Sequence, residues 1–392
     1  MGTPAGPSVV VIGGGVIGLS LAWRAAQRGL SVTVADPDPG TGASYAAAGM
    51  ITPVSEAAYA ERELYRLGVA AQRQYAAFAA ELTGATGLPT GYRQTGTLQV
   101  AWDSDDLAVL REYGALQESF GVTIQPLTGR ECRAAEPMLG PSVRGGLLAP
   151  DDASVDPRLL TSALLMAATG AGVRLIRSAA VEVTSASGRA DGAVLADGTE
   201  LRADFVVLAA GWRSGAVAGL PQEVLPPVRP VKGQILRLRP GPGSPPGGPP
   251  GLLNRTVRGI VQGSSVYLVP RDSGELVVGA TQEEMGSDTR VTAGGVWELL
   301  RDARAIVPGI TELELAEAVA GLRPGTPDNA PVLGPAALPG LVLATGHFRA
   351  GVLLAPVTAD LICGYLATGE LDSLAEPFGP GRFAPVRQEA GR

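Results

Sequence analysis

A strand, a glycine-rich turn, a helix and a second strand follow one another near the N-terminus. No other stretch constrains the fold as strongly. The sequence SVVVIGGGVIGLSLAWRAAQRGLSVTVAD covers residues 8–36. Its first five residues are mostly β-branched and apolar, which is typical of a buried parallel strand. Apolar residues then recur at helical spacing up to Gly29, and a second short strand ends at Asp36. The pattern predicts an α/β domain that begins with a βαβ unit.

Three glycines in the turn predict a dinucleotide site. Gly13 allows the tight turn, Gly15 lets a pyrophosphate approach the backbone, and Gly18 lets the helix pack closely against the strand. The N–H groups at the start of the helix attract the anion. Asp36 follows Gly13 by 23 positions, and an acid near this place accepts hydrogen bonds from ribose hydroxyls. We therefore predict a Rossmann-like nucleotide-binding domain, with a plain glycine turn as the alternative.

The motif by itself leaves FAD and NAD open. The segment GTGASYAAAGMITP, residues 40–53, follows the acid directly and consists mainly of small residues. Such a backbone can lie close against a flat ring system. In an NAD-type fold we would expect another helix and strand soon after the acid. The segment therefore favours FAD.

The length of 392 residues, of which 45% are hydrophobic, predicts two domains with substantial cores. The apolar strand FVVLAAG, residues 205–211, returns to the nucleotide-binding domain, so that domain is assembled from separated pieces. We assign residues 1–83, 140–225 and 325–392 to the FAD-binding domain and residues 84–139 and 226–324 to a substrate-binding domain.

Coarse patterns predict the remaining elements. Apolar spacing and capping predict helices over residues 56–83, 105–119, 127–139, 157–168 and 352–365. Alternation predicts strands over residues 95–102, 229–238, 265–270 and 275–280. Residues 239–251 are almost all Pro, Gly and Ser, which predicts a mobile surface loop.

Composition excludes several classes of function. The net charge is −7 and no basic run is present, so nucleic acid is not an expected partner. The N-terminus has no basic segment before its glycine-broken apolar stretch, so we expect neither signal peptide nor membrane span, and a cytoplasmic location. Cys132 and Cys363 lie far apart without metal-ligand spacing, so we expect no metal site and a reducing compartment.

Two arginines late in the chain are candidates for binding a carboxylate. Arg323 lies in LRPGT and Arg349 in GHFRAG. A guanidinium binds a carboxylate through two parallel N–H···O bonds, which a lysine cannot reproduce. The alternative for each is a structural salt bridge. Tyr267 is a candidate donor to the same carboxylate or a core residue, and Met50 either limits the size of the substrate or simply packs.

Two other residues keep alternatives open. His347 is the only histidine, and the glycines around it favour a contact with the flavin or a structural role over proton transfer. Lys232 is the only lysine, and a structural or solvated role is favoured over a place near the flavin. No catalytic acid or base is predicted, because a flavin can accept a hydride directly.

The motifs GGGVIG, SYAAAGMI, VKGQ, VYLVPR, VVGAT, AGLRPGTPD and GHFRAGVLLAP occur in this order along nearly the whole chain. Together they resemble the glycine oxidases, in the D-amino acid oxidase and sarcosine oxidase group of FAD flavoproteins. The resemblance implies an α+β substrate domain with a large antiparallel sheet and oxidation of glycine and small amines by O2, releasing H2O2. It also implies a supply of imine for thiamine thiazole synthesis, and a homo-oligomer, as in the homotetramers of the family.

The resemblance also implies site residues. Substrate contacts would be Arg323, Arg349, Tyr267 and Met50. Cofactor contacts would be Gly13, Gly15, Val16, Ile17, Gly18, Asp36, Ala43, Ser44, Ala48, Gly49, Met50, Val181, Gly211, His347, Phe348, Arg349, Ala350, Gly351, Val352 and Leu353.

Two departures qualify the resemblance. Relatives can carry His where this chain has Ser265, which leaves the preferred substrate open among glycine, sarcosine and D-amino acids. The sarcosine oxidases with covalent flavin carry cysteine where this chain has Gly321, so we expect noncovalent FAD. An NAD-dependent dehydrogenase and a non-enzymatic flavin-binding protein remain more distant alternatives.

Overall fold

The computed structural model describes residues 6–56, 59, 61–224, 226–241 and 251–383, and the chain forms two compact units. The first unit comprises Met1–Gly40, Leu164–Pro230 and Arg323–Arg392, and the second comprises Thr41–Ala163 and Val231–Leu322. Residues 41–83 and 140–163, which we assigned to the FAD-binding domain, fall in the second unit. Which substrate or cofactor each part binds stays a prediction.

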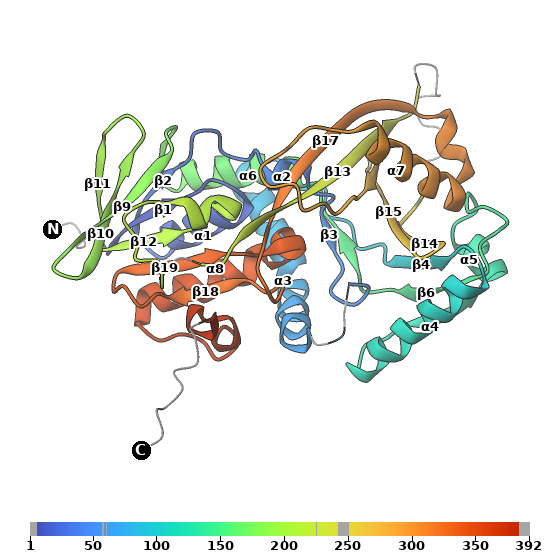
Figure 1. The fold of residues 1–392 in the computed structure, drawn as a ribbon, viewed down its shortest axis with the longest axis horizontal. Coiled ribbons are helices and arrows are strands. Elements are labelled where there is room, and N and C mark those ends of the chain that lie inside the picture. Colours follow the sequence, from blue (N-terminus) through green and yellow to red (C-terminus); the bar gives the residue numbers. More distant parts are fainter. Residues whose placement is uncertain (1–5, 57–58, 60, 225, 242–250, 384–392) are drawn as a thin grey trace. The chain divides into compact units, whose positions relative to one another are not determined.

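A six-stranded sheet forms the centre of the first unit, in the order β18-β19-β12-β1-β2-β8 (Figure 1). Its strands are β1 Ser8–Ile12, β2 Ser31–Ala35, β8 Arg174–Ile176, β12 Phe205–Leu208, β18 Val332–Pro335 and β19 Leu341–Thr345. All neighbours pair in parallel except β18 and β19, which are antiparallel. The sheet confirms the predicted Rossmann-like α/β architecture.

Both faces of this sheet are covered, which explains the uninterrupted apolar sequence of β1. On one face, Val10 and Ile12 join the apolar cluster that also contains residues of a three-stranded antiparallel sheet. On the other, the Cγ1 of Val11 lies close to Gly18 of helix α1. The small sheet consists of β9 Ala180–Ala186, β10 Arg189–Leu195 and β11 Glu200–Arg202.

Two apolar helices, α1 Val16–Gln27 and α8 Gly351–Thr368, pack against each other in the first unit (Figure 1). The stretch from Phe348 to Thr368 is long and apolar enough to cross a membrane by length and composition alone. Most of it is buried inside the protein, however, so its composition is that of a core helix.

An eight-stranded sheet dominates the second unit, in the order β17-β13-β16-β15-β14-β4-β6-β5. Its strands are β4 Thr97–Ala101, β5 Gln125–Thr128, β6 Gly145–Ala149, β13 Arg229–Arg239, β14 Thr256–Val261, β15 Ser264–Pro270, β16 Leu276–Gly279 and β17 Glu314–Gly325. Five neighbouring pairs are antiparallel: β13–β16, β16–β15, β15–β14, β4–β6 and β6–β5. Strands β14 and β4 pair in parallel. The predicted large antiparallel sheet is thus present, with one parallel pair.

The alternation of β15 separates two apolar clusters in the second unit. Val266 and Leu268 join the larger cluster, which includes residues of α7 Ala293–Ile306. Tyr267 and Val269, on the other face, join a smaller cluster that contains Met50. The period of two along the strand therefore sends Tyr267 to the face that also holds Met50.

The remaining elements complete the two units. They are α2 Ala43–Ala46, β3 Met50–Ile51, α3 Arg62–Thr86, α4 Ser104–Ser119, α5 Gly129–Ala135, β7 Ala153–Ser154 and α6 Pro157–Gly170. Short 3-10 helices span Gly211–Ala216, Pro308–Glu312, Phe348–Ala350, Glu376–Phe378 and Pro380–Phe383.

The predicted start of a helix agrees with the observed one where a neighbouring side chain caps the helix. The Asp156 carboxylate accepts a hydrogen bond from the Arg158 N–H at 2.9 Å, which caps α6 as predicted. By contrast, the helix predicted from residue 56 begins only at Arg62, because residues 53–56 form a turn. Residues 242–250 of the predicted mobile loop lie outside the described residues.

Candidate active site

The glycine turn of the first unit is built around close backbone approaches. A Cβ on Gly13, whose φ is +112°, would lie 2.4 Å from the Ala209 carbonyl oxygen. A Cβ on Gly18 would lie 1.9 Å from the Gly13 oxygen. Because β1 lies between β2 and β12, the turn also occupies the switch point of the sheet, where such folds bind dinucleotides.

The charges around this turn fit a dinucleotide. Asp36 accepts hydrogen bonds from the Gly14 N–H at 2.6 Å and the Asp38 N–H at 2.8 Å, so its carboxylate is held beside the turn. Helix α1 starts after Gly15 without a capping side chain and without an acidic residue in its first turn, which includes Val16 and Ile17. A helix start of this kind suits a pyrophosphate, and a carboxylate suits ribose hydroxyls.

The segment from Gly346 to Leu353 forms a second special turn in the first unit. Gly346 has φ +73°, and a Cβ there would lie 2.6 Å from the Thr326 Cγ2. Phe348 has φ +46°, a left-handed conformation that costs a non-glycine residue about 1–2 kcal/mol. Ala350 and Gly351 then lead into α8, whose first turn includes Val352 and Leu353 and contains no acid. Strained backbone before an uncapped helix start is a common feature of ligand sites.

His347 turns its side chain towards α8. Its Nε2 lies 3.0 Å from the Thr358 hydroxyl, and the residue is buried. Burial lowers the pKa of His347 to about 3, so the imidazole is neutral at physiological pH. These contacts favour the structural role over proton transfer.

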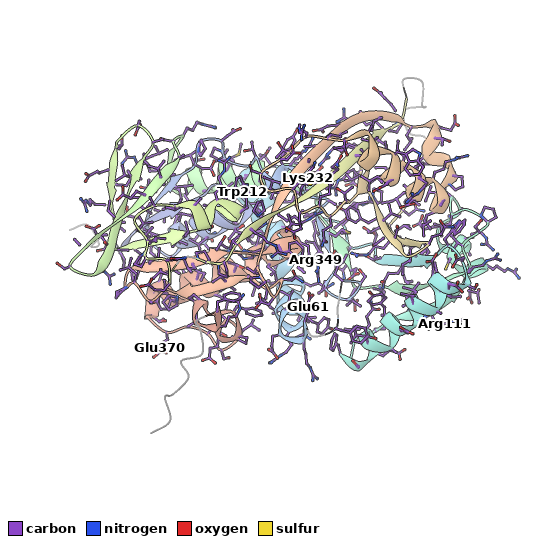
Figure 2. The ribbon with its side chains drawn as sticks, in the orientation of Figure 1. Glu61, Arg111, Trp212, Lys232, Arg349 and Glu370 are labelled. Atoms are coloured by element: carbon purple, nitrogen blue, oxygen red, sulfur yellow. The ribbon has the colours of Figure 1, made fainter. Side chains whose placement is uncertain are left out.

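The two candidate arginines both belong to the first unit. Arg323 is half-buried, and Arg349 is exposed at the start of α8 (Figure 2). The loop after Arg323 and the loop before Arg349 meet where Thr326 packs against Gly346. Arg229 reinforces this junction, because its Nη1 donates to the Thr326 carbonyl at 3.0 Å. The structure thus brings together the loop that follows Arg323 and the loop that precedes Arg349.

Two predicted cofactor residues lie elsewhere in the first unit. Val181, on β9, is 45% exposed, and its carbonyl accepts a hydrogen bond from the Ala218 N–H. Gly211 has φ +57°, and its carbonyl accepts the Thr345 hydroxyl at 3.1 Å. A buried Ser214 hydroxyl lies 2.7 Å from that of Thr345, so the loop after β12 is held to the end of β19.

The other predicted cofactor residues belong to the second unit. Ala43 and Ser44 begin α2, and Ala48 and Gly49 lead from α2 into β3, which starts at Met50. Gly49 has φ +77°, and a Cβ there would lie 2.0 Å from the Val155 oxygen. The backbone of this segment is therefore packed tightly against the chain after β7.

Met50 and Tyr267 come together in the smaller apolar cluster of the second unit. A Cβ on Gly279 would lie 2.4 Å from the Tyr267 hydroxyl, so the tyrosine ring occupies the space above this glycine. The Met50 sulfur lies 3.9 Å from an Arg258 Nη1 that also donates to Glu56 at 2.7 Å. Ser265 is exposed on the same strand as Tyr267.

Lys232 lies on β13 and is completely buried (Figure 2). Its Nζ is 3.3 Å from a Glu283 oxygen and 3.9 Å from an Asp288 oxygen, so its charge is compensated within the second unit. Gly321 leaves room for α2, because a Cβ there would lie 2.7 Å from the Ala46 Cβ.

Two ionisable residues gain importance only in the structure. Asp152 is completely buried and accepts the Ser55 hydroxyl at 2.8 Å; burial raises its pKa to about 7. Arg271 follows β15 and is also buried. The sequence around Asp152 and Arg271 does not indicate that either side chain is buried, although Arg271 ends the motif VYLVPR. Among the described residues, no group of three His, Cys, Asp or Glu side chains is arranged to hold a metal ion.

Comparison with known proteins agrees with this geometry. A family model described as FAD dependent oxidoreductase matches residues 8–364. The glycine oxidase of Geobacillus kaustophilus is 33% identical over 94% of this chain and 95% of its own length. The crystal structure of glycine oxidase from the same organism superposes with a TM-score of 0.86 at 31% identity, covering 97% of this chain and all of that one.

A bifunctional ThiO/ThiG protein of Synechocystis is 36% identical over 96% of this chain. Only 54% of that protein is matched, so the chain spans about half the length of these bifunctional relatives.

Proposed function

The chain belongs to the family of FAD-dependent oxidoreductases, and on that premise we propose that it oxidises glycine and other small amines with O2. For glycine the balanced reaction consumes O2 and H2O and yields glyoxylate, NH3 and H2O2. The glycine turn, with Asp36 held beside it, supports noncovalent binding of FAD. When bound, FAD supplies the acceptor for the hydride from Cα and returns the electrons to O2.

The observation that carries the proposal is the contact between the loop after Arg323 and the loop before Arg349. Gly346 packs against Thr326, which lies three residues after Arg323, and Arg349 lies three residues after Gly346. We propose that both guanidinium groups bind the carboxylate of an amino acid, because a guanidinium fork matches a carboxylate. Fixing the carboxylate orients the Cα–H bond, and orientation is the main contribution that the protein makes to hydride transfer.

Two residues of the second unit support a small substrate. We propose that Tyr267 donates its hydroxyl to the carboxylate and that Met50, in the same apolar cluster, limits the size of the substrate side chain. His347 takes no part in proton transfer in this proposal, because an imidazole with a pKa of about 3 is a weak base and its Nε2 is directed at Thr358. We propose that the substrate reacts as the neutral amine.

The decisive experiment is a peroxide assay of the flavin-loaded protein with glycine, sarcosine, D-alanine and D-proline. Glycine is expected to support turnover. Turnover with D-proline or D-alanine alone would replace the proposal with a D-amino acid oxidase. A colourless protein that reduces NAD would overturn the premise.

Arg323→Ala tests the carboxylate clamp. Removing one partner of a charge pair costs about 2–5 kcal/mol, which corresponds to a rise in the KM for glycine of about thirtyfold to several thousandfold. Arg323→Lys is expected to recover only part of this loss, because an ammonium cannot form the bidentate fork. Arg174→Ala is the matched control, because it removes an exposed charge on β8, an edge strand of the six-stranded sheet, whereas Arg323 lies on β17 of the eight-stranded sheet. An unchanged KM in Arg323→Ala would exclude the clamp.

We also propose that the imine product feeds thiazole synthesis, since ThiO and ThiG form one polypeptide in the bifunctional relatives. A strain that lacks its own ThiO and requires thiazole should then grow when it expresses this chain. A cytoplasmic location and a homo-oligomer, with a tetramer as the proposed state, belong to the same proposal. Light scattering on the purified protein measures the oligomeric state.

A further inference from the structure

Arg271 is an arginine that the proposed chemistry does not use, yet it is almost completely buried. It follows β15 directly, and only 7% of its surface is exposed. Burial lowers the pKa of Arg271 to about 10, so the guanidinium still carries its charge at neutral pH. A charge removed from water in this way requires specific partners.

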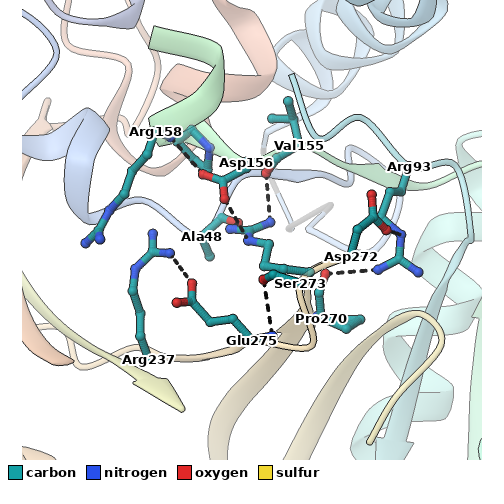
Figure 3. A network of polar contacts seen from close by, with 12 residues as sticks. Ala48, Arg93, Val155, Asp156, Arg158, Arg237, Pro270, Asp272, Ser273 and Glu275 are labelled. Atoms are coloured by element: carbon teal, nitrogen blue, oxygen red, sulfur yellow. Dashed lines mark hydrogen bonds and ion pairs between the residues drawn. The ribbon is translucent and has the colours of Figure 1, made fainter. Parts of the chain in front are cut away.

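Its partners are main-chain carbonyl groups of two separate segments. The Nη2 of Arg271 donates to the Ala48 carbonyl at 2.6 Å, and its Nη1 donates to the Val155 carbonyl at 2.9 Å. Asp156 lies 3.7 Å from the Nε and compensates the charge. Figure 3 shows Ala48, Val155 and Asp156 gathered in this network. The planar guanidinium therefore joins the chain before β3 to the chain after β7.

The same two segments are fixed to each other at Gly49. The Val155 N–H donates to the Gly49 carbonyl at 2.8 Å. The Val155 oxygen, which accepts from Arg271, also lies where a Gly49 side chain would otherwise be. Both carbonyl groups of the Ala48–Gly49 pair are thus occupied, one by Arg271 and one by Val155.

Occupying the Ala48 carbonyl determines the direction of the next N–H. The peptide bond between Ala48 and Gly49 is trans, so its C=O and N–H point in opposite directions. The Gly49 N–H consequently points away from Arg271. A cation at the carbonyl also polarises the amide and strengthens its N–H as a donor, because linked hydrogen bonds reinforce one another.

From these contacts we propose that Arg271 is a positioning residue that holds the Ala48–Gly49 peptide so that the Gly49 N–H donates to the flavin ring of bound FAD. The proposal rests on the predicted contact between residues 48–50 and the flavin, and so on the proposed function. It goes beyond that function by giving Arg271 a role at the cofactor without contact to substrate.

The test compares Arg271→Met, Arg271→Lys and a matched control. The apoprotein of each full-length variant is titrated with FAD, and the dissociation constant, the visible absorption spectrum and the midpoint potential of the flavin are measured. Arg93→Met is the control, because Arg93 also donates to main-chain carbonyls, those of Pro270 and Asn254, and contacts neither Ala48 nor Gly49. It lies with Asp272 at the other end of the network (Figure 3).

We expect Arg271→Met to weaken FAD binding at least tenfold, to shift the flavin spectrum and to lower its potential. Arg271→Lys keeps the charge but loses the fork, so it should fold and show the same changes to a smaller extent. Arg93→Met should match the wild type. If Arg271→Lys folds and matches the wild type in all three measurements, the proposal is refuted. None of these measurements needs turnover, so a protein that binds FAD but does not oxidise glycine would overturn the proposed function alone.

Discussion

The buried carboxyl group of Asp152 should make the stability of the protein depend on pH in an unusual direction. Burial raises the pKa of Asp152 to about 7, although the Ser55 hydroxyl and the nearby Arg258 oppose this shift. In the unfolded chain the pKa of an aspartate is about 3.9. Between these values the folded protein binds a proton that the unfolded chain releases. Asp152 therefore contributes stability below about pH 4 that is lost as the pH rises through about 7.

The size of the effect follows from the width of this window. From pH 5 up to the folded pKa of about 7, the stabilisation from the protonated Asp152 falls by about 1.4 kcal/mol per pH unit, over about 2 units. The expected loss is therefore about 3 kcal/mol. Asp152→Asn keeps the shape of the neutral acid and cannot ionise. Relative to the wild type, it should gain about 3 kcal/mol in free energy of unfolding between pH 5 and pH 8.

Urea unfolding at the two pH values measures this difference, with FAD at the same saturating concentration for each protein. Other titrating groups cancel in the comparison of variant with wild type. Asp151→Asn makes the same chemical change at an exposed neighbour and is the control. Ser55→Ala should move the window to higher pH, because it removes a hydrogen bond that favours the charged form. The measured quantity is the difference in free energy of unfolding between Asp152→Asn and the wild type. If this difference changes by less than about 0.5 kcal/mol between pH 5 and pH 8, which is the usual scatter of surface substitutions, Asp152 does not have the raised pKa.

Two further predictions concern stability. His347→Gln should show the opposite pH dependence: burial lowers the pKa of His347 to about 3, so its contribution is present above about pH 6.5 and lost as the pH falls. In the same urea assay, the free energy of unfolding of the variant should rise relative to that of the wild type as the pH falls from 7 to 4. If the difference between the two proteins does not change with pH, His347 is not held neutral in the folded protein. Gly18→Ala should abolish FAD binding or folding, because its Cβ would meet the Gly13 oxygen, whereas Gly84→Ala, in open space on α3, should stabilise by about 0.5–1 kcal/mol. Thermal unfolding with and without FAD distinguishes these two outcomes.

The elements that the sequence predicted well are those whose cause is local. The strand, glycine turn and helix from Ser8 to Gln27 follow from a dozen neighbouring residues, as does the start of α6 at Asp156. The family, the FAD dependence and the antiparallel sheet followed from motifs in a fixed order. The helix predicted from residue 56 began too early, because alanine-rich composition alone does not mark the turn that precedes Arg62.

What only the tertiary structure decided is the environment of the ionisable residues. Arg271 and Ala48 are 223 positions apart, and Ser55 and Asp152 are 97 apart, so no spacing rule relates them. Burial raises the pKa of Asp152, and the partners of Lys232 are Glu283 and Asp288, more than 50 positions away in the chain. The sequence by itself determined which ionisable groups the protein has and the local turns that we predict to bind a dinucleotide. Folding decided which of those groups are charged and what they hold in place, because burial and hydrogen bonding depend on partners brought together from far along the chain.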